Sequence, residues 1–448
     1  MAKTKLLRSL LLSMAIAAVI DGGAVEGKWR GKLELGQTKL DLIFNFKSEG
    51  NEISKCTMDV PMQGANGIPV EVAYCNGDSL SLLIKQIGAS FSGIITDDKI
   101  TGEFSQRGFT FPLTLKPDTD LSERRPQTPR APFPYTSIDT TFIAKDGTLL
   151  AGTLVIPTTA DSRKMPVVVM VSGSGPQNRD EEIFEHRPFA VIADYLARNG
   201  IASLRYDDRG MFESKGDFSS SVFDTFKDDA ESALEFVGTF PQFGNKGIIG
   251  HSEGGTIALK LASENLPDFV VSLAGMAVSG KECIMKQNER SLGRLGIDDI
   301  EKEESLQLIS ACFDSIITGN NGIPFDVDAY IRENDLGVPQ HVVASVKANL
   351  NAGNEWFGSL LRLNPRDWLA GIKKPVLAIN GTLDTQVDAD SNLATIKEYV
   401  GSAEVKSYPG LNHLMQHAST GEIAEYGEIK ETISPEVLQD IVSFIKSL

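Results

Sequence analysis

A glycine-rich turn between a predicted strand and a predicted helix offers the clearest chemistry in the sequence. Residues 250–255 read Gly-His-Ser-Glu-Gly-Gly, which matches the pattern Gly-x-Ser-x-Gly around Ser252. The apolar run 246–249 before it predicts a strand, and the run TIALKLASENL after it predicts a helix. Such a turn lifts the serine hydroxyl clear of the sheet, and the glycines give the crowded backbone room to close. The pattern predicts that Ser252 is a nucleophile; the alternative is a glycine-rich turn without chemistry.

A nucleophilic serine requires a base, because its hydroxyl group attacks a carbonyl group poorly at neutral pH. Of the five histidines, His413 and His417 follow the expected strand 403–408, in a loop where the base is expected. We assign His413, which comes directly after the Pro-Gly turn, and keep His417 as the alternative. His251 lies beside the nucleophile, where we expect its ring to point away. His186 is expected before a helix, and His341 in a helical insertion.

A carboxylate must then fix the tautomer of the histidine and stabilise its protonated form. Asp384 follows the apolar strand 376–379 in the turn Gly-Thr-Leu-Asp, so the order along the chain is serine, aspartate, histidine. Asp388 and Asp390 are the alternatives, but they lie further from the strand end and fit solvated loop positions. No histidine or cysteine lies beside these aspartates at ligand spacing, so we predict no metal site.

The developing oxyanion needs two backbone N–H donors. One is expected from Glu253, the residue after the nucleophile. The second should come from the loop 172–177, Ser-Gly-Ser-Gly-Pro-Gln, which follows the apolar strand 167–171. We assign Ser174, with Gly175 as the alternative. No step of this chemistry requires a cofactor.

The elements that must position these residues occupy the second part of the chain. Short alternating strands fill 25–117 and predict a small antiparallel β domain, a barrel or a sandwich. A Pro- and Arg-rich stretch, 118–135, predicts a linker. Apolar strands alternate with helices over 136–448, which is typical of a mostly parallel sheet covered on both faces. This alternation lapses over 276–370, where charged, helix-forming sequence predicts an inserted helical cap.

The first residues have the pattern of an export signal. Lys3, Lys5 and Arg8 precede the apolar run 10–20, which is too short to cross a bilayer as a helix. We predict a signal peptide at 1–24 and a periplasmic or secreted protein; the alternative is a buried N-terminal helix.

Composition restricts the partners. The net charge of −17 over 448 residues argues against binding to nucleic acid, and no later apolar stretch is long enough to span a membrane.

The cysteines allow disulfides or buried free thiols, and the sequence leaves both open: Cys56, Cys75, Cys283 and Cys312. The oligomeric state is not determined by these patterns.

Taken together, the motifs GHSEGG, SGSGPQNRDE, LRYDDRG, INGTLD and YPGLNH resemble the esterase and serine-aminopeptidase-like branch of the α/β-hydrolases, over about 138–448. The resemblance implies an α/β-hydrolase fold with a helical cap, and similar bacterial esterases carry an N-terminal β domain. It also implies that Asp208 and Arg209 form a structural ion pair. The chain departs from the pattern at Ser172, where many relatives have histidine, and at Met211-Phe212, where a second glycine is usual.

We therefore expect a serine hydrolase that cleaves small carboxylic esters through an acyl-enzyme intermediate. One alternative is an aminopeptidase or amidase, in which acidic residues would hold a free amino group: Glu181, Glu182, Glu185 or the run 301–304. The other alternative is a non-catalytic binding protein on the same fold.

Overall fold

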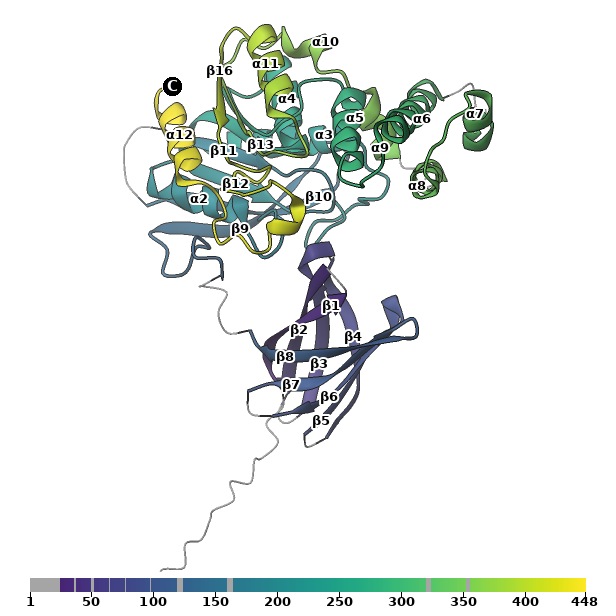
Figure 1. Cartoon of the computed structure of the whole chain (residues 1–448). Helices are drawn as coiled ribbons and strands as arrows, with labels where there is room; N and C mark the ends of the chain where they lie inside the picture. Colours follow the sequence, from purple (N-terminus) through teal and green to yellow (C-terminus); the bar gives the residue numbers. More distant parts are fainter. Residues whose placement is uncertain are drawn as a thin grey trace, which may run out of the picture. The chain divides into compact units, whose positions relative to one another are not determined.

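The computed structural model describes residues 25–448 except for 36–37, 50–51, 64, 77, 97, 119–123, 159–163, 320–323 and 352–354. The chain divides into two compact units, Met1–Asp120 and Leu121–Leu448 (Figure 1). The predicted signal peptide, 1–24, lies outside the described residues.

The first unit is a closed antiparallel barrel, which confirms the expected β domain and decides between a barrel and a sandwich. Each strand pairs with the next, and β1 also pairs with β8 to close the sheet. Inward side chains such as Leu80, Leu82 and Ile84 alternate with outward ones and fill the interior with apolar atoms. The strands are β1 (Gly27–Leu35), β2 (Thr38–Glu49), β3 (Glu52–Val60), β4 (Ala65–Asn76), β5 (Ser79–Ile84), β6 (Ala89–Ile95), β7 (Ile100–Gln106) and β8 (Phe109–Pro117), with short 3-10 helices η1 (Pro61–Gln63) and η2 (Lys85–Ile87).

The second unit contains one sheet in the order β16-β15-β14-β13-β11-β12-β10-β9. Six neighbouring strands are parallel, and β10 and β9 are antiparallel at one edge. This is the mostly parallel sheet that the alternating pattern predicted. The strands are β9 (Tyr135–Ile143), β10 (Leu149–Pro157), β11 (Met165–Val171), β12 (Ala202–Tyr206), β13 (Phe243–His251), β14 (Phe269–Leu273), β15 (Val376–Gly381) and β16 (Ala403–Tyr408).

Helices cover both faces of this sheet, as Figure 1 shows. In β11, Val167 and Val169 pack in one apolar cluster while Val168 and Met170 pack in the other, because successive side chains of a strand point to opposite faces. One face carries α3 (Phe223–Gly238), α4 (Glu253–Ser263), α10 (Arg366–Leu369) and α11 (Ala389–Tyr399). The other face carries α2 (Pro188–Arg198) and α12 (Pro435–Lys446).

A helical cap is inserted in the chain between β14 and β15, where the charged sequence predicted it, although the two strands pair directly in the sheet. Its helices share an apolar cluster of their own around Leu308 and Phe313. They are α5 (Gly280–Leu292), α6 (Asp299–Thr318), α7 (Val327–Glu333), α8 (Gln340–Asn351) and α9 (Glu355–Arg362). Across the described ranges, no helix has the length and apolar character needed to cross a bilayer.

Part of the expected linker is attached to the second unit. The Arg125 guanidinium is buried and donates hydrogen bonds to the backbone oxygens of Phe184, Gly427 and Ile429. The Gln127 side chain donates to Ile433 O. Residues around Arg125 therefore belong to the second unit in structure, although their sequence resembles a linker.

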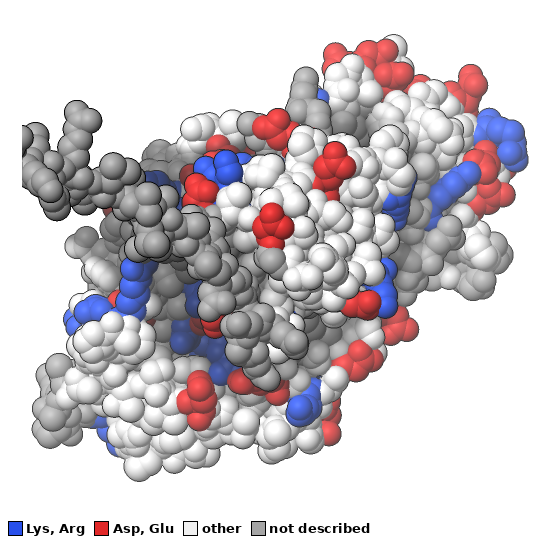
Figure 2. All heavy atoms as spheres, turned by 90° about the horizontal axis from the view of Figure 1, so that it is seen from below, with Lys and Arg blue, Asp and Glu red and all other residues white. Residues whose placement is uncertain are grey.

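On the face in Figure 2, Lys and Arg side chains of the described residues lie among Asp and Glu side chains. All four cysteines are free thiols; Cys75 is exposed and the other three are buried.

Candidate active site

Ser252 occupies a strained turn between β13 and α4. Its backbone has φ 53° and ψ −119°, a conformation that is rare for a residue with a side chain. The flanking glycines are sterically required: a Cβ on Gly250 would lie 2.0 Å from Gly254 O, and a Cβ on Gly254 would lie 2.0 Å from Val171 O. The strain is typical of a serine presented for chemistry at the end of a strand.

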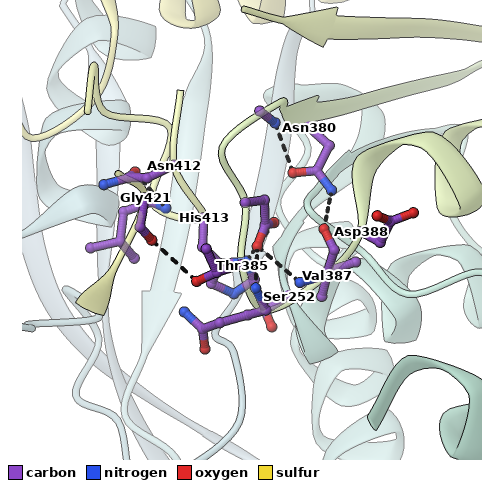
Figure 3. Close-up of polar contacts among 12 residues, drawn as sticks. Ser252, Asn380, Thr385, Val387, Asp388, Asn412, His413 and Gly421 are labelled. Carbon is purple, nitrogen blue, oxygen red and sulfur yellow. Dashed lines mark hydrogen bonds and ion pairs between the residues drawn. The ribbon is translucent and has the colours of Figure 1, made fainter. Parts of the chain in front are cut away.

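Asp384 and His413 come together beyond the ends of β15 and β16. Figure 3 shows His413 near Thr385 and Val387, which follow Asp384 in the chain. His413 Nδ1 lies 2.8 Å from Asp384 Oδ2, and both residues are buried. Asp384 Oδ1 accepts hydrogen bonds from the backbone N–H groups of Gln386, at 2.8 Å, and Val387, at 2.9 Å. Because this carboxylate accepts at each oxygen, the imidazole donates from Nδ1, which leaves Nε2 able to take a proton.

The alternative acid, Asp388, has a structural role. Its carboxylate accepts the Ser391 N–H at the start of α11 and forms ion pairs with Lys286 and Arg290 of α5. Burial opposes ionisation, but these hydrogen bonds and charges hold the pKa of Asp388 well below its ordinary value. Asp390 is exposed in the first turn of α11.

The alternative base, His417, lies at the surface. Its side chain is 56% exposed, and its Nδ1 lies 2.9 Å from Glu431 Oε1. Of the histidines that follow β16, only His413 contacts Asp384.

A cavity of about 500 Å³ is lined by Ser252 and by residues of the cap helices. Ser174, Ser252 and Glu253 line its inner end. Cap residues line the rest with mostly apolar and small polar side chains, among them Ile284, Gln287, Phe313, His341 and Trp356. A cavity of this size and character is typical of a small-molecule site.

The loop after β11 has one backbone donor already occupied. The Gly173 N–H donates to Glu181 Oε1 at 2.7 Å. Ser174 lines the cavity with Ser252, whereas Gly175 adopts φ +95° and lines a separate small hollow. This arrangement favours Ser174 over Gly175 as the second donor.

Glu253 contributes a buried carboxyl group that the sequence reasoning missed. Trp356 of α9 donates its indole N–H to both carboxylate oxygens, at 2.9 and 3.2 Å. Burial raises the pKa of Glu253 to about 7, and the Trp356 hydrogen bond opposes the shift. No local sequence signal could have indicated this contact, because Trp356 lies in the cap, 103 positions away.

The expected ion pair between Asp208 and Arg209 is not formed. Arg209 instead binds Asp229 and Asp146. Asp208 accepts the Ser172 hydroxyl at 2.8 Å and the Gln177 N–H at 2.9 Å. Asp208 therefore orders the loop after β11, and the serine that replaces the usual histidine is its partner.

His251 does not turn its ring away from the site. Its two ring nitrogens lie 2.9 Å from Glu181 Oε1 and 2.9 Å from the backbone oxygen of His413. Neither contact was predicted. Within the described part of the chain, no group of three or more His, Cys, Asp or Glu side chains has the arrangement of a metal site.

The sequence model of the family described as serine aminopeptidase S33 matches residues 185–418, more than half of the chain. The chain belongs to this family. The protein is thus an α/β hydrolase of the S33 serine aminopeptidase-like group, as the motifs indicated. The matched range contains Ser252, Asp384 and His413.

Similar proteins include esterases. Esterase EstD of Thermotoga maritima is 29% identical over 278 residues, which cover 61% of this chain and 60% of that protein, so the match spans less than two thirds of the relative. Among solved structures, the esterase Pf2001 of Pyrococcus furiosus has a TM-score of 0.43 at 17% identity, covering 70% of this chain and 91% of that chain. Est1E of Butyrivibrio proteoclasticus with bound ferulic acid has a TM-score of 0.41 at 15% identity, covering 68% and 100%.

Proposed function

We propose that this hydrolase cleaves carboxylic esters, with Ser252 as nucleophile, His413 as base and Asp384 as the acid that orients the base. The observations that carry the proposal are the buried Asp384–His413 hydrogen bond and the strained backbone of Ser252, which lines a cavity. These are the parts that acyl transfer requires.

In the proposed reaction, His413 Nε2 takes the Ser252 proton as the hydroxyl attacks the ester carbonyl carbon. The backbone N–H groups of Glu253 and Ser174 bind the oxyanion of the tetrahedral intermediate. The intermediate collapses, the alcohol leaves with the proton from His413, and an acyl-enzyme remains. Water, deprotonated by His413, then attacks the acyl carbon to form a second tetrahedral intermediate. This intermediate collapses as the bond to Ser252 Oγ breaks and His413 returns the proton to Ser252, which releases the acid.

Ester substrates are favoured over peptides because recognition of a free amino group needs an available carboxylate. Most acidic residues that the sequence offered for this role bind other groups in the structure: Glu181 with His251, Glu182 with Arg187, Glu185 with Arg124, Glu301 at the start of α6, and Glu304 with the Gly337 N–H.

One observation favours the second candidate, an aminopeptidase. Glu253 is a buried carboxyl group that lines the cavity beside Ser252. An amino group placed there would gain a charge partner away from water.

A direct comparison of substrates tests the proposal. The purified protein should hydrolyse nitrophenyl butyrate faster than amino-acid nitroanilides, and Ser252→Ala should abolish the ester activity. A preference for the anilides that is lost in Glu253→Gln would replace the esterase by an aminopeptidase. Failure of a fluorophosphonate probe to label Ser252 in folded protein would leave a non-catalytic binding protein.

We also propose export, on the charged and apolar order of residues 1–24. N-terminal sequencing of protein from the native host should find a start beyond Ala17. An intact Met1 on cytoplasmic protein would contradict this.

A further inference from the structure

One buried histidine contacts two loops that the proposed reaction uses. His251 is the last residue of β13, directly before Ser252. Its Nε2 lies 2.9 Å from the backbone oxygen of His413, and its Nδ1 lies 2.9 Å from Glu181 Oε1. The same Glu181 oxygen accepts the N–H of Gly173, at 2.7 Å. The Glu181–His251 pair therefore connects the loop that contains His413, the proposed base, to the loop that contains Gly173 and Ser174, the proposed second oxyanion donor.

The two contacts together specify a protonation state. A backbone carbonyl oxygen can only accept a hydrogen bond, so His251 Nε2 must carry a proton. Glu181 Oε1 accepts from Gly173, and with Glu181 ionised this oxygen can only accept, so His251 Nδ1 then carries a proton as well. A ring that donates from both nitrogens is an imidazolium.

The surroundings stabilise this charge. His251 and Glu181 are 7% and 3% exposed, so their attraction is only weakly screened by water. Asp384 adds a second negative charge, and the ring of His413 lies with its centre 4.7 Å from that of His251. Burial opposes the charge, but Glu181, the His413 carbonyl and Asp384 together outweigh it and raise the pKa of His251 above its ordinary value. Asp208 is a further acidic group that interacts with Glu181.

The backbone at Glu181 gives an independent indication. This residue has φ +52°, in the left-handed region that non-glycine residues rarely occupy. Such strain persists only where the surrounding structure requires it, and it collects at functional sites.

We propose that His251, held as an imidazolium by Glu181, is a positioning residue of the active site. It fixes the backbone of His413 and, through Glu181, the backbone of Gly173, so the base and the oxyanion loop keep their spacing around Ser252. The inference rests on the proposed function, because it takes His413 to be the base.

The first test replaces each member of the pair by an uncharged residue. His251→Gln and Glu181→Gln should each lower kcat by about 10- to 100-fold, as loss of a supporting hydrogen-bond partner commonly does. KM should stay near the wild-type value, because neither side chain lines the cavity. The double variant should be no slower than the slower single variant, because the two residues act as one unit.

A matched histidine–glutamate pair on the same chain supplies the control. His417 and Glu431 make a contact of the same length, 2.9 Å, at the surface and away from the cavity. His417→Gln and Glu431→Gln should keep the wild-type kcat. If the surface pair and the buried pair have equal effects, the inference is wrong.

The second test observes the protonation state of His251 directly in the wild-type protein and uses a variant only to assign the signal. Nitrogen NMR of the wild-type protein labelled in its histidines should show one ring with both nitrogens still protonated above the ordinary pKa of histidine, and this signal should vanish in His251→Gln. A ring with unprotonated Nδ1 would place the proton on Glu181 and overturn the imidazolium.

The outcomes separate the two proposals. If His413→Ala is inactive while folded His251→Gln and Glu181→Gln retain full kcat, the positioning role fails and the triad stands. If His413→Ala retains wild-type activity, the proposed function itself fails.

Discussion

The two units of this chain bury different kinds of side chain. The barrel interior is apolar, with large residues such as Phe44 and Phe91 at its centre. In the described part of the chain, the buried polar and charged residues all lie at Arg125 or beyond. Several of them surround Ser252: Glu181, Asp208, His251, Glu253, Asp384 and His413.

The contrast shows how buried charge is tolerated where chemistry needs it. Taking an ionised group out of water is costly unless hydrogen bonds or an opposite charge replace the water. Asp384 accordingly accepts from His413 and two backbone N–H groups, and Glu181 faces His251. Such groups are fewer in the described part of the barrel unit, where the Asp118 side chain pairs with Arg30, and the barrel interior is stabilised by apolar burial. We therefore expect substitutions near Ser252 to affect catalysis and changes to the barrel to leave it intact.

The largest effect is expected from the nucleophile and the base. Ser252→Ala and His413→Ala should each lower kcat for an ester by a factor on the order of 10⁶, because members of a triad act together. Steady-state kinetics measures the loss, and circular dichroism must show folded protein. His417→Gln is the control; if it matches Ser252→Ala while His413→Ala stays active, the base is His417.

A smaller loss is expected from the acid. Asp384→Asn should lower kcat by about 10⁴, because the uncharged amide no longer favours the productive tautomer of His413. Asp388→Asn is the matched comparison: asparagine can still cap α11, but the ion pairs with Lys286 and Arg290 are lost. That variant should lose stability and keep most of its kcat. A greater kinetic loss in Asp388→Asn would reassign the acid.

Glu253 should make stability depend on pH. Its pKa is raised from an ordinary value of 4.5 to about 7, so between these values the folded protein holds a proton that the unfolded chain has released. Stability from this group therefore falls as pH rises through that window. The free energy of unfolding of Glu253→Gln, measured relative to wild type, should rise by about 3 kcal/mol as the pH rises from about 4 to about 8.

Urea unfolding followed by helical circular dichroism measures this gain, because the described α-helices lie in the catalytic unit. Glu235→Gln, at an exposed position of α3, is the control and should show no such change. If the free energy of unfolding relative to wild type depends on pH equally in both variants, burial does not raise the pKa of Glu253.

The smallest effect on catalysis is expected from removing the barrel. A fragment that starts at residue 121 should keep the wild-type kcat for a small ester, because every proposed catalytic residue and the cavity lie in the second unit. A fragment that starts at residue 136 lacks the buried Arg125 and should be less stable by about 2 kcal/mol. If the longer fragment folds but is inactive, the barrel takes part in the site.

Much of the fold followed from pattern. The parallel strands appear as short apolar runs because both of their faces are buried, as Val167–Val171 illustrate. Closure of the barrel was not predictable, because it depends on pairing between β1 and β8 at opposite ends of the domain. The attachment of Arg125 was hidden for a similar reason: its backbone acceptors at 427 and 429 lie about 300 positions away.

By itself, the sequence determined the fold class and the candidates for acid, base and nucleophile. Each candidate comes directly after its own parallel strand, and the carboxyl ends of parallel strands meet at the same edge of a sheet. The tertiary structure shows the contact between the assigned Asp384 and His413, and only it revealed the Glu181–His251 and Glu253–Trp356 contacts. Those contacts join residues 70 and 103 positions apart, and such pairings depend on how strands, loops and cap pack in space rather than on any local pattern.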